Sequence, residues 1–279
     1  MLKVGDGLRA QIYGVLHSPP VKRILPRVPF MRDVYLGWKR RHPFDREYGI
    51  ETSGFIEVSA LAPDPETGKS MQCYGGSQPG IVRRVLATLP DKSGFTFVDL
   101  GCGKGRALVV ASEFDFNAIL GVDISKPVLD QARENADVVR TRFPERTPIQ
   151  LLQGNAFTFM PEVDKLVIYL YHPFGREGVE QFVAGLEEKI ESEAAQVFVV
   201  YCNPVWSGIL DHSRALSRWS AATLPYDTEE IGFGPDMTDT VVVWQSEPAR
   251  YAPQRGANRH VYLTGPMRAE LEASPRATH

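Results

Sequence analysis

A glycine-rich turn preceded by an acid is the segment of this sequence best suited to bind a ligand. The turn follows an apolar strand pattern at 95–98 and precedes an apolar helix at 107–111. Between them stand Asp99 and three alternating glycines, Gly101, Gly103 and Gly105. Glycine lets the backbone approach a ligand where a Cβ would collide, and the start of the following helix offers free N–H groups. The pattern predicts a nucleotide-type ligand at the carboxyl end of the first strand of a doubly wound sheet.

Two further strand ends carry residues suited to the same ligand. A second apolar strand at 118–122 leads into Asp123 and Ile124. An acid about twenty residues after the turn can accept hydrogen bonds from both ribose hydroxyls, although by itself it could equally cap a helix or a turn. A third strand at 149–152 is closed by Gly154, Asn155 and Ala156, where a plain Gly-Asn turn is the alternative. Three such strand ends in this order favour one nucleotide-containing cofactor.

The spacing of the glycines and the acid before them argue against a dinucleotide cofactor. The third glycine comes one residue earlier than in the dinucleotide fingerprint G-x-G-x-x-G, and the acid before the turn suits a cationic amine better than a pyrophosphate. Asp99 with its glycines resembles motif I of the class I S-adenosylmethionine-dependent methyltransferases. The resemblance implies S-adenosylmethionine as cofactor, with Asp99 and the glycines at its methionine part and Asp123 and Ile124 at the ribose. It also implies adenine contacts from Asn155 and from the backbone N–H of Ala156.

The fourth predicted strand, at 163–170, ends in a segment that could carry the reaction. Tyr171-His172-Pro173-Phe174 resembles the Asn/Asp-Pro-Pro-Tyr/Phe motif of amino-group methyltransferases, but His172 stands where an acid or amide is expected, and one proline is missing. In that motif a backbone carbonyl and a side-chain oxygen orient the amine, and the carbonyl of His172 could still do so. His172 and Tyr171 are therefore the candidate catalytic residues. Imidazole suits a general base near neutral pH, and the alternative is a histidine that only shapes the loop.

The resemblance extends beyond these motifs. Residues 44–54, Tyr74, the glycine turn and the strand-four segment look like a bacterial group of class I methyltransferases of unassigned substrate, over roughly residues 42–205. The resemblance implies that residues 45–54 and Tyr74 line the cofactor entrance.

Composition limits the other possibilities. A chain of 279 residues with 43% hydrophobic content can bury one large core with an appended cap. It contains no run of eighteen apolar residues, so we expect no membrane span. Cys73, Cys102 and Cys202 lack the spacing of metal ligands, which predicts reduced thiols, no metal site and a cytoplasmic location.

The net charge of −3 conceals a basic N-terminal arm. Residues 1–46 carry a net charge of +7, so the remainder carries −10. A basic arm on an acidic body can bind nucleic acid or an anionic membrane surface, or can dock on its own acidic domain. We favour the last alternative, so nucleic acid is not the expected partner.

The elements around these motifs predict an α/β fold: a doubly wound, seven-stranded Rossmann-like methyltransferase sheet with an N-terminal helical and hairpin cap. Helices are expected at 7–17, 31–41, 82–89 and 179–190, and a cap hairpin from strands at 55–61 and 71–74 across a turn-rich stretch at 63–70. The remaining strands are expected at 196–201 and in a terminal hairpin, 218–224 with 240–245, that holds one antiparallel strand. This divides the chain into a cap at 1–74, a methyltransferase domain at 75–247 and a loosely attached tail at 248–279.

The predicted function is transfer of a methyl group from S-adenosylmethionine to nitrogen or oxygen of a small molecule or a protein side chain. Two alternatives remain open on the sequence: a nucleic-acid methyltransferase that uses the basic arm, and a non-catalytic protein that binds the cofactor.

Overall fold

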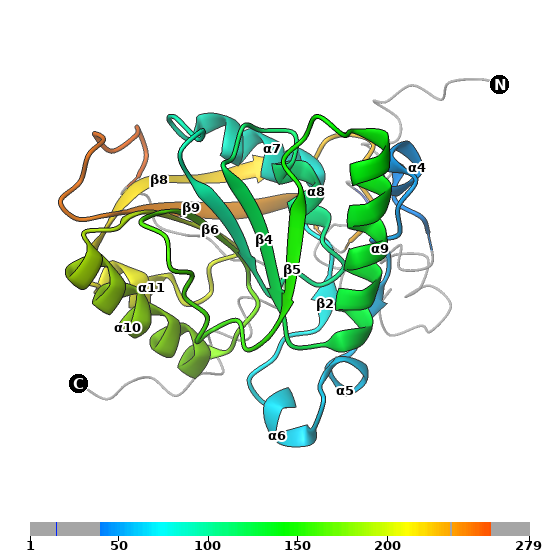
Figure 1. Ribbon diagram of the computed structural model, residues 1–279, viewed down its shortest axis with the longest axis horizontal. Helices are drawn as coiled ribbons and strands as arrows, with labels where there is room; N and C mark the ends of the chain where they lie inside the picture. Colours follow the sequence, from blue (N-terminus) through cyan, green and yellow to red (C-terminus); the bar gives the residue numbers. More distant parts are fainter. Residues whose placement is uncertain (1–14, 16–39, 235, 258–279) are drawn as a thin grey trace.

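The computed structural model describes residues 15, 40–234 and 236–257 and is built around a central mixed sheet (Figure 1). The order of its seven strands is β5-β4-β3-β6-β7-β9-β8. The strands are β3 (Thr96–Leu100), β4 (Ala118–Asp123), β5 (Ile149–Gln153), β6 (Lys165–Tyr171), β7 (Gln196–Cys202), β8 (Leu216–Pro225) and β9 (Thr238–Ser246). The helices beside it are α7 (Pro79–Thr88), α8 (Arg106–Ala111), α9 (Lys126–Arg142), α10 (Arg176–Glu193) and α11 (Ser207–Asp211). The predicted sheet is confirmed, with element bounds within a few residues of those expected.

One strand of the sheet is reversed. β3 to β7 pair in parallel, whereas β9 runs antiparallel to both β7 and β8. The predicted antiparallel strand in the terminal hairpin is therefore correct. Because β9 is reversed, its first residues lie at the edge where β6 and β7 end, which is the edge that positions the site.

Helices cover both faces of the sheet, so its central strands are apolar throughout. In β6, Val167 and Tyr169 pack into the hydrophobic cluster under α7, α8 and α9. The alternating residues Leu166 and Ile168 pack into the second cluster, under α10 and α11. This two-sided burial explains a continuous hydrophobic strand, as expected for parallel strands between helical layers.

The cap differs in part from its prediction. It contains α4 (Pro43–Tyr48), β1 (Phe55–Ile56), α5 (Val58–Leu61), α6 (Pro65–Gly68) and β2 (Tyr74–Gly75). The expected hairpin forms, but each strand is only two residues long, with Phe55 opposite Gly75. The rest of the predicted strand is α5, which buries Leu61. The turn-rich stretch contains α6, because the Asp64 side chain accepts the first free N–H groups of that helix.

The helix predicted at 31–41 is wrong at its end. Arg40 and Arg41 are not helical, and the helix α4 begins two residues later. The His42 side chain accepts the Phe44 N–H, and Pro43 occupies the first helical position, so the local capping sets this start. The rest of that prediction lies outside the described residues, as does the predicted helix at 7–17 apart from residue 15.

The beginning of the expected tail is attached to the sheet. The backbone of Tyr251 exchanges two hydrogen bonds with the Gln245 side chain, at 2.6 and 3.2 Å, and its ring stacks on Phe198. The Gln254 N–H donates to the Trp219 carbonyl at 2.6 Å. Residues 258–279 lie outside the described part. Among the described residues, no helix is long and apolar enough to cross a membrane.

Candidate active site

A cavity of about 210 Å³ lies where β3, β4, β5 and β6 end. Ten of the eleven predicted site residues line it: Tyr74, Asp99, Gly101, Gly103, Asp123, Ile124, Asn155, Ala156, Tyr171 and His172. The remaining one, Gly105, is the N-cap of α8. The topology thus brings together residues that are almost one hundred positions apart in the sequence.

The three glycines allow both a left-handed backbone and close packing in the turn. Their φ angles are 81° at Gly101, 51° at Gly103 and 83° at Gly105, in the region that favours glycine. A Cβ on Gly103 would stand 2.4 Å from a ring carbon of Tyr74. A Cβ on Gly101 would stand 2.7 Å from Cβ of Pro173. The glycine turn therefore admits a side chain from the cap and another from the loop after β6.

Two acids of the site are buried and differ in their partners. The carboxylate of Asp123 accepts the Gly103 and Ser125 backbone N–H groups, each at 2.8 Å. Asp99 is 4% exposed, and its side chain has no hydrogen bond or ion pair with the described residues. Burial raises the pKa of both carboxyl groups, and the charge of Asp123 raises the pKa of Asp99 further. A buried, unpaired acid beside glycine N–H groups fits a ligand that brings an ammonium group, such as the methionine part of the cofactor.

Ser125 is a candidate site residue that the sequence analysis did not single out. Its position before α9 suggests a helix cap, but its side chain makes no capping hydrogen bond. The hydroxyl is buried, has no partner among the described residues and belongs to a residue that lines the cavity beside Asp123 and Ile124. Because a serine at the start of a helix is normally explained by capping, nothing in the sequence indicated that this hydroxyl would be unpaired at the cavity.

The loop after β6 places an aromatic group and an imidazole at the cavity. His172 has a φ of 45°, which is uncommon for a residue with a Cβ, and is 4% exposed. Its Nδ1 lies 3.2 Å from the Tyr201 hydroxyl, and the two rings are stacked. Phe174 packs edge-on against Phe157, with ring centroids 5.6 Å apart. Non-glycine residues in the left-handed region are found preferentially at functional sites, which agrees with the predicted position of His172.

The cap forms one wall of the cavity. The cap and linker residues that line it, besides Tyr74, are Leu61, Thr67, Ser70, Met71, Gln72, Cys73, Gly75, Gly76 and Ser77. A β-bridge joins Met71 to Phe174, and the Gly175 N–H donates to the Ser70 carbonyl at 3.2 Å. Apart from Tyr74, the sequence analysis did not single out these residues, because they follow no strand of the main sheet.

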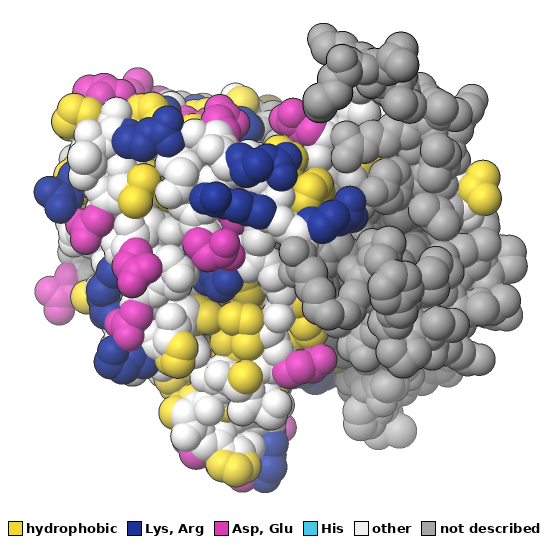
Figure 2. All heavy atoms as spheres, turned by 90° about the vertical axis from the view of Figure 1, so that its right-hand side faces the viewer, with side chains coloured by type: hydrophobic (Ala, Val, Ile, Leu, Met, Phe, Trp, Pro, Cys, Tyr) yellow, Lys and Arg dark blue, Asp and Glu magenta, His cyan; other side chains and the backbone are white. Residues whose placement is uncertain are grey.

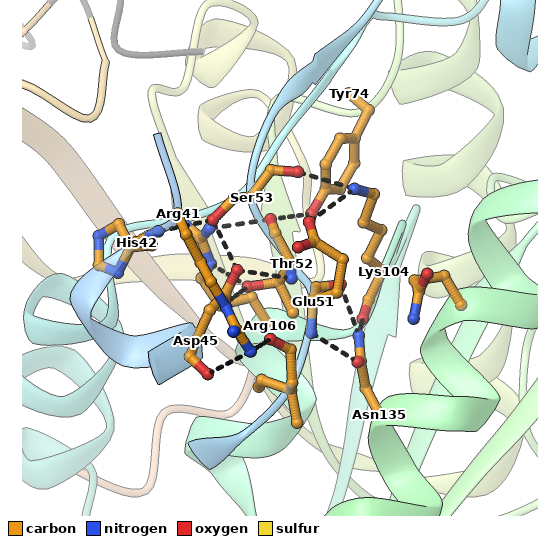
Figure 3. A network of polar contacts seen from close by, with 12 residues as sticks. Arg41, His42, Asp45, Glu51, Thr52, Ser53, Tyr74, Lys104, Arg106 and Asn135 are labelled. Atoms are coloured by element: carbon orange, nitrogen blue, oxygen red, sulfur yellow. Dashed lines mark hydrogen bonds and ion pairs between the residues drawn. The ribbon is translucent and has the colours of Figure 1, made fainter. Parts of the chain in front are cut away.

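The prediction that residues 45–54 line the cofactor entrance is wrong. None of them lines the cavity. They form a polar network within the cap, in which Asp45 accepts hydrogen bonds from Thr52 and Ser53 (Figure 3). The Thr52 carbonyl in turn accepts the Tyr74 hydroxyl at 2.6 Å. Because Asp45 is completely buried, its oxygens need these donors, and the segment turns inward.

Two basic residues of the glycine turn are held by this network. Arg106 donates from Nη2 to the Thr52 carbonyl at 2.8 Å and from Nη1 to the Gly76 carbonyl at 3.1 Å. Lys104 donates to the Ser53 carbonyl at 2.7 Å (Figure 3). The turn that carries the predicted cofactor residues and the cap are therefore joined by buried hydrogen bonds.

Comparison with known proteins identifies one domain in the chain. Residues 91–167 match a family model described as a methyltransferase domain. The matched segment contains the glycine turn, Asp123 and Asn155. No curated protein sequence matches the chain.

Several solved structures are similar to part of the chain. TrmN from Thermus thermophilus is 18% identical, with a TM-score of 0.43 over 62% of this chain and 50% of that one. A candidate RNA methyltransferase from Pyrococcus horikoshii is 17% identical, with a TM-score of 0.44 over 60% of this chain and 82% of that one. A candidate class I S-adenosylmethionine-dependent methyltransferase from Listeria monocytogenes is 16% identical, with a TM-score of 0.45 over 70% of this chain and 69% of that one. The chain thus spans only half the length of the Thermus protein.

The matched domain, the strand order and the motif turn are those of class I S-adenosylmethionine-dependent methyltransferases. The match indicates a methyltransferase domain whose methyl donor is S-adenosylmethionine. The predictions of fold, enzyme class and cofactor are confirmed.

Proposed function

We propose that the enzyme methylates nitrogen or oxygen of a small molecule or of a protein side chain. The observation that carries the proposal is the cavity, which joins Asp99, Asp123 and Asn155 to Tyr171 and His172 in one space. Because the cap forms one wall of this cavity, the cavity suits an acceptor that enters it as a small chemical group. In this proposal residues 75–247 bind the donor, the cap at 1–74 controls access, and residues 248–279 are accessory.

The residues that we assign to the donor come from three strand ends. S-adenosylmethionine supplies a methyl group on an activated sulfonium. Asp99 accepts hydrogen bonds from the ammonium of the methionine part, and Asp123 accepts those from the ribose hydroxyls. Asn155 and the backbone N–H of Ala156 contact the adenine. The support for these roles is that each residue lines the cavity at the end of its strand.

Tyr171 and His172 are assigned to the acceptor. Methyl transfer is an in-line displacement, so holding the two reactants in contact supplies much of the rate. The carbonyl of His172 orients the acceptor, and its imidazole takes the proton when the acceptor is protonated.

Nucleic acid is not the acceptor in this proposal. On the face that carries α9, lysine and arginine side chains are mixed with aspartate and glutamate in the described part (Figure 2). On α9 the charges pair locally, as in Lys126–Asp130 and Arg140–Asp137. A surface of mixed sign does not attract a polyanion as a uniformly basic one does. The free cysteines Cys73, Cys102 and Cys202 accord with the cytoplasmic location that we include in the proposal.

A matched pair of variants tests the ribose assignment. Asp123 ends β4, and the exposed Asp115 precedes the same strand at the opposite edge of the sheet. Asp123→Ala should weaken S-adenosylmethionine binding by about 1–3 kcal/mol, or about five- to 150-fold, as measured by calorimetry. Asp115→Ala should leave the affinity unchanged, and NAD should bind weakly to the parent. Equal affinities for the cofactor in both variants would remove the ribose assignment.

The acceptor is tested separately with labelled donor. Transfer of a tritiated methyl group is measured to a panel of small amines and alcohols, to protein extracts and to DNA and RNA. The proposal expects label in the first two classes. Label found only in nucleic acid, with the transfer falling steeply between 50 and 200 mM salt, would replace it with the nucleic-acid alternative.

A further inference from the structure

A second buried polar cluster lies next to the cavity, at the same edge of the sheet. Its centre is Asp239, the second residue of β9. Because β9 is antiparallel to β7, this residue lies beside the ends of β6 and β7. The N–H of Asn203, which follows β7, donates to the Thr240 carbonyl at 2.7 Å and fixes this corner of the sheet.

The carboxylate of Asp239 is buried and only partly satisfied. It is 1% exposed, and its Oδ1 accepts both the Asn203 side-chain amide at 2.9 Å and the Tyr226 hydroxyl at 2.8 Å. Its Oδ2 has no hydrogen-bond partner, and the side chain forms no ion pair with the described residues. A buried carboxylate with an unpaired oxygen is costly, so its retention in the fold calls for a functional explanation.

Tyr171 connects this cluster to the cavity. It is the last residue of β6, and it lines the cavity. Tyr171 is opposite Cys202 of β7, and Cys202 is opposite Val241 of β9, so Tyr171 ends at the same corner of the sheet as Asp239. Burial raises the pKa of the Tyr171 hydroxyl most, and the charges of Asp239, Cys202 and Asp236 raise it further. The wall at Tyr171 is therefore a neutral aromatic ring with carboxylate charge behind it. Both the face of an aromatic ring and a nearby carboxylate attract cations.

We propose that Asp239, with Tyr171 and Tyr226, forms a subsite for a positive charge at the Tyr171 end of the cavity. The proposal rests on the proposed function and specifies the chemistry preferred there. Two reactants can bring that charge: the sulfonium of S-adenosylmethionine and an ammonium group of the acceptor. Asp239 is a positioning residue, because it acts through Tyr171.

The donor provides a probe that isolates the sulfonium. S-adenosylmethionine carries this charge, whereas S-adenosylhomocysteine has a neutral thioether and the same remaining groups. Calorimetry at pH 7.5 compares the two affinities in the parent and in Asp239→Asn, which keeps the shape and removes the charge. The control is Asp137→Asn, which loses the same charge on the exposed surface of α9. If the sulfonium occupies the subsite, Asp239→Asn should reduce the preference for S-adenosylmethionine by about tenfold, and the control should not change it.

A second arm tests the ammonium. With saturating S-adenosylhomocysteine, propylammonium chloride is titrated against the parent and Asp239→Asn, and 1-propanol serves as the neutral control. If the acceptor brings the charge, propylammonium should bind the parent complex and not the variant complex, while 1-propanol binds neither. In that case the preference between the two nucleosides stays unchanged in Asp239→Asn.

A third variant guards against a merely structural effect. Tyr226→Phe removes one donor to Asp239, which makes the carboxyl group harder to ionise. If the negative charge of Asp239 is needed for cation binding, binding to Tyr226→Phe should be weakened at pH 6.5 and restored at pH 8. Unchanged nucleoside preference together with no Asp239-dependent binding of propylammonium would overturn the subsite. Failure of the parent to bind either nucleoside would instead count against the proposed donor residues.

Discussion

Replacing Asp239 by asparagine should change how protein stability depends on pH. Burial raises the pKa of this carboxyl group from a usual value of 3.8 to about 6. The folded state therefore holds the proton more tightly than the unfolded chain does. The contribution of Asp239 to stability is fully present below pH 3.8 and is lost as the pH rises through about 6. A shift of about two pKa units corresponds to about 3 kcal/mol at pH 7.5.

The assay is urea unfolding of the parent and of Asp239→Asn at several pH values between 4 and 7.5. Subtracting the two free energies of unfolding cancels the groups that titrate alike in both proteins. The neighbours that can carry charge near Asp239 are Tyr171, Cys202, Tyr226 and Asp236. The pKa values of both tyrosines and of the cysteine are raised, so these three stay protonated throughout.

We expect the parent to lose about 2–3 kcal/mol relative to the variant across this range. The same pair made in an Asp236→Asn background removes the other carboxyl group that influences Asp239. A difference that stays flat with pH in both backgrounds, or that grows in favour of the parent, would refute the reasoning that burial of Asp239 costs stability.

Two further substitutions test the cavity wall. Gly103→Ala should destabilise the protein by about 1–3 kcal/mol in urea unfolding. The reason is that the new Cβ would stand 2.4 Å from the Tyr74 ring, on a backbone with positive φ. Unchanged stability would show that the cap can move away from the glycine turn without loss of stability. Ser125→Ala should leave the thermal stability of the free protein nearly unchanged. It should weaken S-adenosylmethionine binding, measured by calorimetry, by about two- to twelvefold, which is the range for one hydrogen bond. Full affinity in this variant would mean that the hydroxyl does not face the ligand.

The sequence predicted the parts of the site that are set by local pattern. An apolar strand followed by Asp99 and alternating glycines specifies its own turn, and Asp123 and Asn155 follow strands with the same pattern. The topology then brings them to one edge without further information. These positions could therefore be predicted without coordinates.

The missed parts depend on contacts between distant segments. We expected Asp45 at a cofactor entrance. Instead its carboxylate is buried and accepts hydrogen bonds from Thr52 and Ser53. Asp239 carried no local signal, because its position beside the end of β7 comes from the reversal of β9. The strand predicted at 55–61 failed for a related reason: Phe55 and Ile56 pair with the facing strand, whereas Val58–Leu61 form a helix.

The buried hydrogen bonds of Arg106 have a consequence for cooperativity. The guanidinium lies on the first residue of α8 and holds carbonyls of Thr52 and Gly76, so the cap cannot separate from the glycine turn without exposing or orphaning these groups. Buried hydrogen bonds thus cross the domain boundary that we propose at residue 74. We therefore expect residues 41–77 and the glycine turn to unfold locally as one unit, so that amide exchange in the cap responds to ligand binding at the cavity.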